Sequence, residues 1–320
     1  MTHEQVQSGT DTTGFDVVAV GGRDPVGFAN TLGVVMSAPH AVDAELLLAA
    51  VLVPNSATSI ISAYITDKRV FNLWSVNAEG EHNAALLEGL DVAMAEIGKR
   101  GMTAVLCLTN FWEWSGGMMN RLARATGQWT DMNDPAHPWP AFPDAVAAFY
   151  SNEEAKAGYY DWVRTVVGRV NTVTGAPYAE DPAVMAWQHA NEPRPGGSDE
   201  AIEAALPHYY DWIDTTAALI REHDPNHLVS LGHEGTMGAG GREDVVVRAH
   251  RNIDYTTAHI WPLNWGWVDG KDLEHTWPDG KEKVEAYIAT ALRLANEAGK
   301  PLAFEEFGFP RDGELYDPQV

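Results

Sequence analysis

The sequence contains a single cysteine, Cys107, which excludes an intrachain disulfide bond and any zinc site built from cysteine ligands. It also lacks a long apolar run, because its longest aliphatic stretch, residues 46–53, is far shorter than a membrane span. Basic residues are scarce: 21 Lys and Arg stand against 45 Asp and Glu, which gives a net charge of −24. A surface this acidic repels the phosphates of nucleic acids and anionic lipids, so neither is expected as a partner, whereas a neutral ligand is not hindered.

Aromatic side chains, in contrast, are abundant: the 320 residues include 12 Trp, 10 Tyr and 9 Phe. Aromatic faces suit sugar rings, apolar ligands or the packing of a core. The first basic residue is Arg23, so the N-terminus lacks the charged start and the apolar stretch of a signal peptide. We therefore expect a soluble chain without an export signal in this stretch of sequence.

From about residue 80 onward, short apolar runs alternate with amphipathic segments. The apolar runs predict strands at residues 103–109, 184–189, 228–231, 255–260 and 302–305. The amphipathic segments predict helices at about residues 87–97, 151–170, 209–220 and 284–294, and Ser151 with Glu154 fits a capping box at the start of the second. Strands that alternate with helices indicate a parallel α/β architecture.

Periodicity alone allows either a doubly wound sheet or a (β/α)8 TIM barrel. Polar residues follow nearly every predicted strand: Asn110, Asn191, His233, His259 and Glu306. Barrels build their sites from the carboxyl ends of many strands, whereas a doubly wound sheet concentrates them at one switch point. This distribution favours the barrel, and no glycine-rich phosphate loop follows any of the strands.

The first seventy residues differ from the rest. They are rich in Ala and Val, with possible strands at residues 16–20 and 59–64 and a possible helix at residues 42–53. We therefore predict an unassigned, irregular segment at residues 1–70, followed by a catalytic barrel at residues 71–320.

Two glutamates, Glu192 and Glu306, each terminate a predicted strand. Paired carboxyl groups on facing strand ends are what glycoside hydrolysis needs: one protonates the leaving oxygen, and the other attacks the anomeric carbon or activates water. The alternative is that both are ordinary carboxylates in salt bridges, for example with Arg194 and Arg311. Their matching positions favour the catalytic interpretation.

Several motifs together carry a resemblance to a known family. They occupy residues 87–91 (LEGLD), 109–117 (TNFWEWSGG), 187–194 (WQHANEPR), 232–235 (GHEG), 259–265 (HIWPLNW) and 304–313 (FEEFGFPRDG). In this order, over about residues 78–313, the sequence resembles glycoside hydrolase family 5 and, within it, the endo-β-1,4-mannanases. The resemblance implies a (β/α)8 barrel, a retaining double displacement on β-mannan or a related neutral polysaccharide, and no cofactor.

The resemblance also assigns the central residues. Glu192 would be the general acid/base and Glu306 the nucleophile, with their carboxyl groups about 5–5.5 Å apart. Because side chains alternate along a strand, Glu305 would point away from the cleft. Asn191 would hydrogen-bond the 2-hydroxyl of the sugar.

Further residues would line the sugar subsites. His259 and Trp261 would lie beside the cleaved sugar, at a position where the broader family often has Tyr instead of Trp261. Arg194 and Glu234 match positions that bind neighbouring sugars in the mannanases.

Some aromatic and polar residues have competing interpretations. Trp112 and Trp114 follow a strand end and could stack against pyranose rings, or pack in the core under a long loop. Trp187 lies within its strand, so we expect it to pack rather than bind. His233 and His259 lack metal-ligand spacing, and Ser115 lacks a Gly-x-Ser-x-Gly motif, so we expect neither a metal site nor a serine hydrolase.

The sequence departs from the family at both ends. An Arg that supports the nucleophile should follow the second strand, and Arg69 is the nearest candidate, in unmatched surroundings. The sequence also stops just after the seventh expected strand, so we expect an incomplete barrel with an irregular N-terminal segment and marginal stability.

Two alternative functions remain open from the sequence. One is a related β-1,4-glucan endohydrolase of the cellulase type, because its catalytic carboxylates would be the same. The other is a non-catalytic carbohydrate-binding remnant, which the missing eighth strand suggests. We expect a monomer. Location stays open, since relatives that degrade polysaccharides are usually exported.

Overall fold

The computed structural model describes residue 82 and residues 84–112, 117–132 and 134–308. Its strands are β1 (Ala104–Cys107), β2 (Val184–Gln188), β3 (Leu228–Ser230), β4 (Thr256–Ile260) and β5 (Leu302–Phe307). Its α-helices are α3 (Ala84–Lys99), α4 (Met118–Thr126), α5 (Ala141–Ala147), α6 (Glu153–Val167), α7 (Asp199–His223), α8 (Glu243–Ala249) and α9 (Leu273–Ala298). Three short 3-10 helices complete the list: η3 (Ala148–Ser151), η4 (Tyr178–Glu180) and η5 (Gly235–Ala239).

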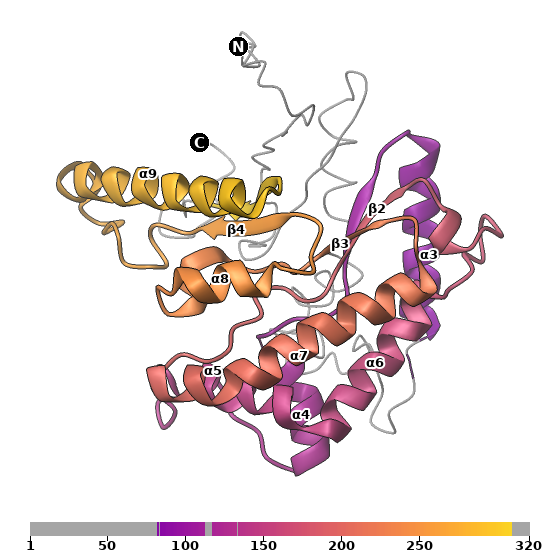
Figure 1. Ribbon diagram of the computed structural model, residues 1–320, viewed down its shortest axis with the longest axis horizontal. Helices are drawn as coiled ribbons and strands as arrows, with labels where there is room; N and C mark the ends of the chain where they lie inside the picture. Colours follow the sequence, from indigo (N-terminus) through magenta and orange to yellow (C-terminus); the bar gives the residue numbers. More distant parts are fainter. Residues whose placement is uncertain (1–81, 83, 113–116, 133, 309–320) are drawn as a thin grey trace, which may run out of the picture.

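The described strands pair in parallel, in two groups. β1, β2 and β3 form one sheet in that order, and β4 pairs with β5. All five predicted strands are confirmed, with ends that differ by at most a few residues, and helices separate them along the chain (Figure 1). This confirms the parallel α/β class. Several predictions fall outside the described residues: the candidate strands at residues 16–20 and 59–64, the candidate helix at residues 42–53, and Arg69. The incomplete barrel and the domain boundary at residue 70 therefore stay predictions.

An aromatic core lies beneath the helices α4, α6 and α7, which pack against one another in the lower part of Figure 1. Trp187, Trp212, Tyr159 and Tyr209 are all fully buried there. Trp187 donates a hydrogen bond from its indole nitrogen to Asp224 Oδ2 at 2.7 Å, so its packing role is confirmed. Burying an indole requires a partner for its N–H, and the loop after α7 supplies one.

The start of α6 corrects the predicted capping box. Asn152, and not Ser151, caps the helix, because its side chain accepts a hydrogen bond from the Ala155 amide at 2.9 Å. Ser151 still belongs to the preceding 3-10 helix η3, and its hydroxyl donates to the Ala148 carbonyl. The prediction was wrong by one residue because Ser151 is the last residue of the 3-10 turn, so the first amides of α6 that need a capping acceptor lie one residue later in the chain.

A buried polar network ties α3 to the loop after α6. The Asp91 carboxylate is fully buried and accepts hydrogen bonds from the Arg169 guanidinium (2.8 and 2.6 Å), from Thr172 (amide 3.1 Å, hydroxyl 2.7 Å) and from the Tyr178 hydroxyl (2.8 Å). Burial alone would raise the pKa of Asp91, but these hydrogen bonds outweigh it and lower that pKa to about 2. A carboxylate paired this thoroughly stabilises the fold in its charged form.

Asp91→Asn is therefore expected to lower the free energy of unfolding by about 2–3 kcal/mol at pH 7, since the shift in pKa from 3.8 to about 2 is worth about that much. The folded-state pKa lies below the unfolded one, so this stabilisation is complete above about pH 4 and disappears as the pH falls towards 2. Denaturant melts of wild type and variant at several pH values measure it.

The matched control is Glu96→Gln on the same helix. Glu96 forms only exposed pairs with Lys99 and Arg100, so its replacement should change stability little. A difference between wild type and Asp91→Asn that stays constant down to pH 2 would contradict the assignment.

Candidate active site

Three buried side chains meet at the carboxyl end of the parallel strands. Glu192 follows β2, His259 lies in β4 and Glu306 lies in β5. Asn191 precedes Glu192 and forms an isolated parallel bridge with Asn110, which extends the pairing of β1 and β2 up to the site. The sequence placed these residues at the ends of parallel strands, and parallel strands bring such ends to one edge of the sheet.

The backbone at Glu192 adopts a conformation that side chains rarely tolerate. Its φ of +50° makes it the one non-glycine residue with a positive φ among the described residues. Its amide donates to the carbonyl of Gly232, and a Cβ atom at Gly232 would lie only 2.0 Å from the Ala190 carbonyl oxygen. The strained turn therefore depends on a glycine neighbour, and local strain of this kind concentrates at functional sites.

His259 links the two carboxylates. Its Nδ1 lies 2.7 Å from Glu192 Oε1 and 3.3 Å from Glu306 Oε2. One carboxylate oxygen of Glu192 and one of Glu306 lie within 4.8 Å of each other. The structure thus brings together the two glutamates that the sequence singled out.

The side-chain direction predicted for Glu305 is wrong. Glu305 is as buried as Glu306, and its Oε2 lies 3.9 Å from His259 Nε2, on the opposite edge of the imidazole ring. The cause is an irregularity in the pairing of β4 with β5: Ala258 pairs with Phe304 and His259 with Glu306, which leaves Glu305 as an extra residue. Such a bulge breaks the alternation of side chains and turns two successive ones towards the same region.

The pKa values within this cluster are coupled. Burial would lower the pKa of His259, but the charge of Glu306 and the hydrogen bond with Glu192 hold that pKa well above its usual value. Burial and the charge of Glu192 raise the pKa of Glu306, against the opposing effect of His259. Burial also acts to raise the pKa of Glu192, but the hydrogen bond and charge of His259, together with Arg194 and Trp112, bring it below its usual value.

These directions are the reverse of the order that the sequence resemblance implies, in which Glu192 holds the proton and Glu306 the charge. The close hydrogen bond from His259 to Glu192 in the free site is the reason. Because the groups share one buried volume, the protons belong to the cluster and can be redistributed when a ligand binds.

Two indole N–H groups complete the shell around the carboxylates. Trp112 Nε1 donates to Glu192 Oε2 at 2.6 Å, and Trp261 Nε1 donates to Glu306 Oε2 at 3.1 Å. Trp261 thus supplies the hydrogen bond to Glu306 that a Tyr hydroxyl could otherwise make. The Trp112 ring is only 8% exposed and lies flat against Phe142, so its stacking against a sugar stays a prediction.

Arg194 and Glu234 form a buried ion pair beside Glu192. The guanidinium meets the carboxylate in two hydrogen bonds, Nε to Oε2 at 2.8 Å and Nη2 to Oε1 at 2.6 Å. The same guanidinium lies over the rings of Trp112 and Trp139, at 5.0 and 5.4 Å from their centroids. Trp139 is a residue that the sequence analysis missed, because nothing in its local pattern links it to Glu192.

Asn191 has a side chain suited to a ligand. It is 6% exposed, and its Nδ2 has no hydrogen-bond partner, although unpartnered buried donors are costly. A sugar hydroxyl would satisfy it. His233 is buried and differs: its Nδ1 accepts from the Gly235 amide, and burial keeps its pKa well below the usual value, so it is neutral.

A metal ion finds little support in the same cluster. Glu192, His259 and Glu306 have potential ligand atoms near one another. However, His259 Nδ1 already lies 2.7 Å from Glu192 and 3.3 Å from Glu306, so contacts between these side chains occupy the position that a metal ion would take. Trp114, Ser115 and Arg311 lie outside the described residues.

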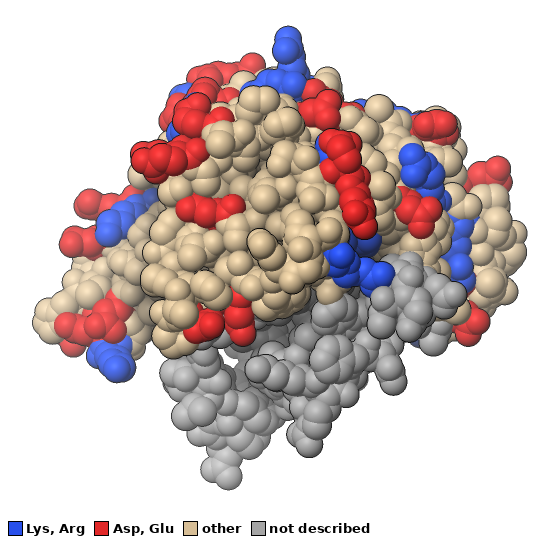
Figure 2. Space-filling view, turned by 90° about the horizontal axis from the view of Figure 1, so that it is seen from below, with Lys and Arg blue, Asp and Glu red and all other residues tan. Residues whose placement is uncertain are grey.

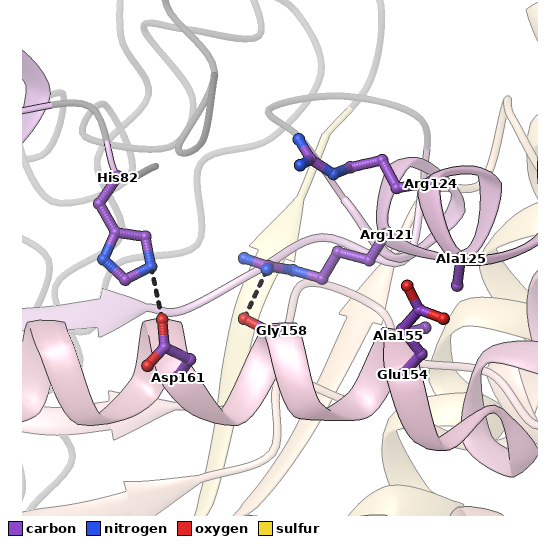
Figure 3. Close-up of a pocket in the computed structure, with 8 residues that line it drawn as sticks. All are labelled: His82, Arg121, Arg124, Ala125, Glu154, Ala155, Gly158 and Asp161. Carbon is purple, nitrogen blue, oxygen red and sulfur yellow. Dashed lines mark hydrogen bonds and ion pairs between the residues drawn. The ribbon is translucent and has the colours of Figure 1, made fainter. Parts of the chain in front are cut away.

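A separate pocket lies on the outer helices and contains none of the predicted site residues. It has a volume of about 220 Å³ and lies between α4 and α6, with His82 at one end (Figure 3). Arg121 is buried there and donates to the Gly158 carbonyl, and His82 pairs with Asp161 at 3.2 Å. The residues that line this pocket include none of the carboxylate cluster, so we treat the pocket as separate from the candidate active site.

Comparison with known proteins adds independent information. The sequence pattern of the group described as "GH family 5 beta-mannosidase-like" matches residues 62–320. Among curated proteins, the chain is 35% identical over 257 residues to a putative mannan endo-1,4-beta-mannosidase 4 of Arabidopsis thaliana, covering 75% of this chain and 57% of the relative. It is 31% identical over 251 residues to mannan endo-1,4-beta-mannosidase 4 of Oryza sativa subsp. japonica, covering 72% and 49%. The chain thus spans about half the length of these relatives.

Solved structures give a consistent result. A glycoside hydrolase family 5 mannosidase from Rhizomucor miehei superposes with a TM-score of 0.64 at 34% identity, covering 73% of this chain and 54% of the other. An endo-beta-1,4-mannanase from Thermotoga petrophila superposes with a TM-score of 0.53 at 27% identity, covering 71% and 46%. These similarities imply that the described parallel strands are part of a (β/α)8 barrel.

Proposed function

The chain belongs to glycoside hydrolase family 5, in its β-mannosidase-like group, and on this basis we propose that it is a retaining hydrolase that cleaves internal β-1,4-mannosidic bonds. The observation that carries the proposal is the short separation of two buried carboxylates, whose nearest oxygens lie within 4.8 Å of each other. Retaining glycosidases hold their carboxyl groups about 5–5.5 Å apart, whereas inverting ones leave about 6.5–9.5 Å for a water molecule.

In this proposal, Glu306 attacks the anomeric carbon and forms a glycosyl ester, while Glu192 gives its proton to the leaving oxygen. Water then attacks the ester, with Glu192 as the base, and the anomeric configuration is retained. Trp261 orients the Glu306 carboxylate, and the free Nδ2 of Asn191 supports binding to the 2-hydroxyl of the sugar.

The reaction needs the proton on Glu192 and the charge on Glu306. The positive charge that develops on the sugar ring favours an ionised Glu306, and the leaving oxygen favours a protonated Glu192. We infer that substrate weakens the contact between His259 and Glu192, because the glycosidic oxygen needs the same region of the Glu192 carboxyl group.

The surface charge is compatible with a neutral polysaccharide substrate. On the face shown in Figure 2, Asp and Glu side chains are spread widely, with Lys and Arg side chains interspersed. Among the described residues, no helix has the length and apolarity needed to cross a membrane.

The test is the release of reducing ends from mannan, glucomannan and carboxymethyl cellulose by the purified chain. We expect cleavage of the two mannose-containing substrates, with little or none of the cellulose derivative, and β-anomers as the first products in time-resolved NMR. Preference for the cellulose derivative would favour the cellulase alternative. Binding to mannan without cleavage would favour the carbohydrate-binding remnant, and α-anomers first would exclude the retaining mechanism.

A further inference from the structure

Trp139 is a large aromatic side chain that remains 63% exposed although it borders the buried site. One face of its ring is covered by the Arg194 guanidinium, which also lies over Trp112. Trp112 in turn donates its indole hydrogen bond to Glu192. Trp139 is therefore the outermost layer of a stack that ends at the proposed acid.

The start of helix α5, which directly follows Trp139, packs against the loop that follows Glu192. The Asp144 carboxylate accepts hydrogen bonds from the amides of Gly197 and Ser198, both at 2.8 Å. A Cβ atom at Gly197 would lie 2.6 Å from Pro140 and from Pro143, so the two segments pack with no room for a side chain. An aromatic ring presented rigidly can bind a ligand without paying much conformational entropy.

The stack also indicates which part of a substrate would reach Trp139. Trp112 contacts Glu192 Oε2, whereas Glu192 Oε1 contacts His259 Nδ1, the nitrogen that also lies near Glu306. The acid faces the glycosidic oxygen and the nucleophile faces the carbon of the cleaved sugar. The flank of Glu192 that is turned away from Glu306 is therefore the side of the leaving sugar.

We propose that the exposed part of the Trp139 ring is the stacking platform for a mannose ring on the leaving-group side of the scissile bond. This inference rests on the proposed function, because it uses the acid role of Glu192. An exposed indole offers a broad apolar surface that matches the C–H face of a pyranose, and Arg194 and Glu234 fix its position from below.

The binding test compares Trp139→Ala with Trp139→Phe in chains that also carry Glu306→Gln, so that mannotetraose is bound without turnover. Calorimetric titration should show a dissociation constant about tenfold higher for the alanine variant and mostly restored for the phenylalanine variant. Trp277→Ala, on α9, is the matched control because Trp277 is also exposed (43%), and it should not change binding.

A kinetic test measures transfer to an acceptor sugar, a quantity that should not change if Trp139 only stabilised the fold. In the double displacement, a mannobiose hydroxyl can replace water in attacking the glycosyl ester, and this acceptor must occupy the leaving-group side. With 4-nitrophenyl β-mannoside as donor, Trp139→Ala should lower several-fold the fraction of the glycosyl ester that is transferred to mannobiose rather than to water, a ratio that does not depend on how fast the donor is cleaved.

The outcomes separate the two claims. Unchanged mannotetraose binding and unchanged transfer in an active Trp139→Ala variant would overturn the platform and leave the hydrolase intact. Wild type that binds mannotetraose through Trp139 without cleaving it would overturn the hydrolase alone. Self-association of the wild type that Trp139→Ala abolishes, with unchanged sugar binding, would mean that Trp139 serves a protein contact.

Discussion

Glu306→Ala is expected to abolish β-mannan hydrolysis, lowering kcat by at least about 10⁴-fold, while mannotetraose binding changes little. Glu306 is buried, its Oε2 accepts the Trp261 indole hydrogen bond, and it lies near the same nitrogen of His259, Nδ1, as Glu192 does. Its main role is to form a bond in the transition state, so its loss affects turnover far more than affinity. Steady-state kinetics on mannan and titration with mannotetraose measure the two quantities.

Glu305→Ala is the informative control, since the bulge in β5 places a second carboxylate beside the same histidine. Glu305 also lies near the hydroxyls of Ser230 and Tyr255, at 3.3 and 3.4 Å, which are groups that do not contact the other glutamates. Its loss should alter the pH profile through His259 but leave measurable turnover. If Glu305→Ala were inactive and Glu306→Ala active, the nucleophile would have been assigned to the wrong residue.

The sequence predicted that Glu192, His259 and Glu306 would lie together, because the signals for this are short-range. Apolar runs that end in Asn191, His259 and Glu306 need only the rule that parallel strands share one carboxyl edge. The bulge at Glu305 could not be predicted in this way, since an extra residue in β5 is defined only by its pairing with β4. The rule that successive side chains of a strand point in opposite directions therefore failed at Glu305 and Glu306, which both lie near His259.

Trp139 is a residue of the site that could not be predicted from the sequence, for a different reason than the bulge at Glu305. It lies 53 residues before Glu192 in the chain, and it meets Arg194 where Pro140 and Pro143 pack against Gly197. A lone Trp before a Pro carries no sequence signal for a binding role. Trp112 was a candidate for sugar stacking from the sequence, but its hydrogen bond to Glu192 could not be predicted, because it joins residues 80 positions apart in the chain.

Glu192→Ala is expected to have the second-largest effect, a loss of about 10² to 10⁴-fold in kcat on mannan. The size of the loss should depend on the leaving group, because the acid is needed only where the departing oxygen must gain a proton. With 2,4-dinitrophenyl β-mannoside, whose leaving group departs as a stable anion, formation of the glycosyl ester on Glu306 should be nearly normal, and a burst of dinitrophenol should precede a slow steady state.

The slow second step gives the sharpest assignment of Glu192. Without its base, water attacks the ester poorly, whereas azide ion needs no deprotonation and should restore turnover. Azide would enter from the face opposite Glu306, displace the Glu306 carboxylate and give a β-mannosyl azide, whose configuration NMR can establish.

The pH profile of Glu192→Ala on the aryl substrate should also lose its alkaline limb, since that limb reports loss of the acid's proton. Trp112→Phe, which removes the 2.6 Å hydrogen bond to Glu192 but keeps an aromatic ring, is the control and should keep this limb, displaced to higher pH because the charged carboxylate has lost a donor. An α-mannosyl azide, or equal losses on mannan and on the aryl mannoside, would show that Glu192 is not the acid/base.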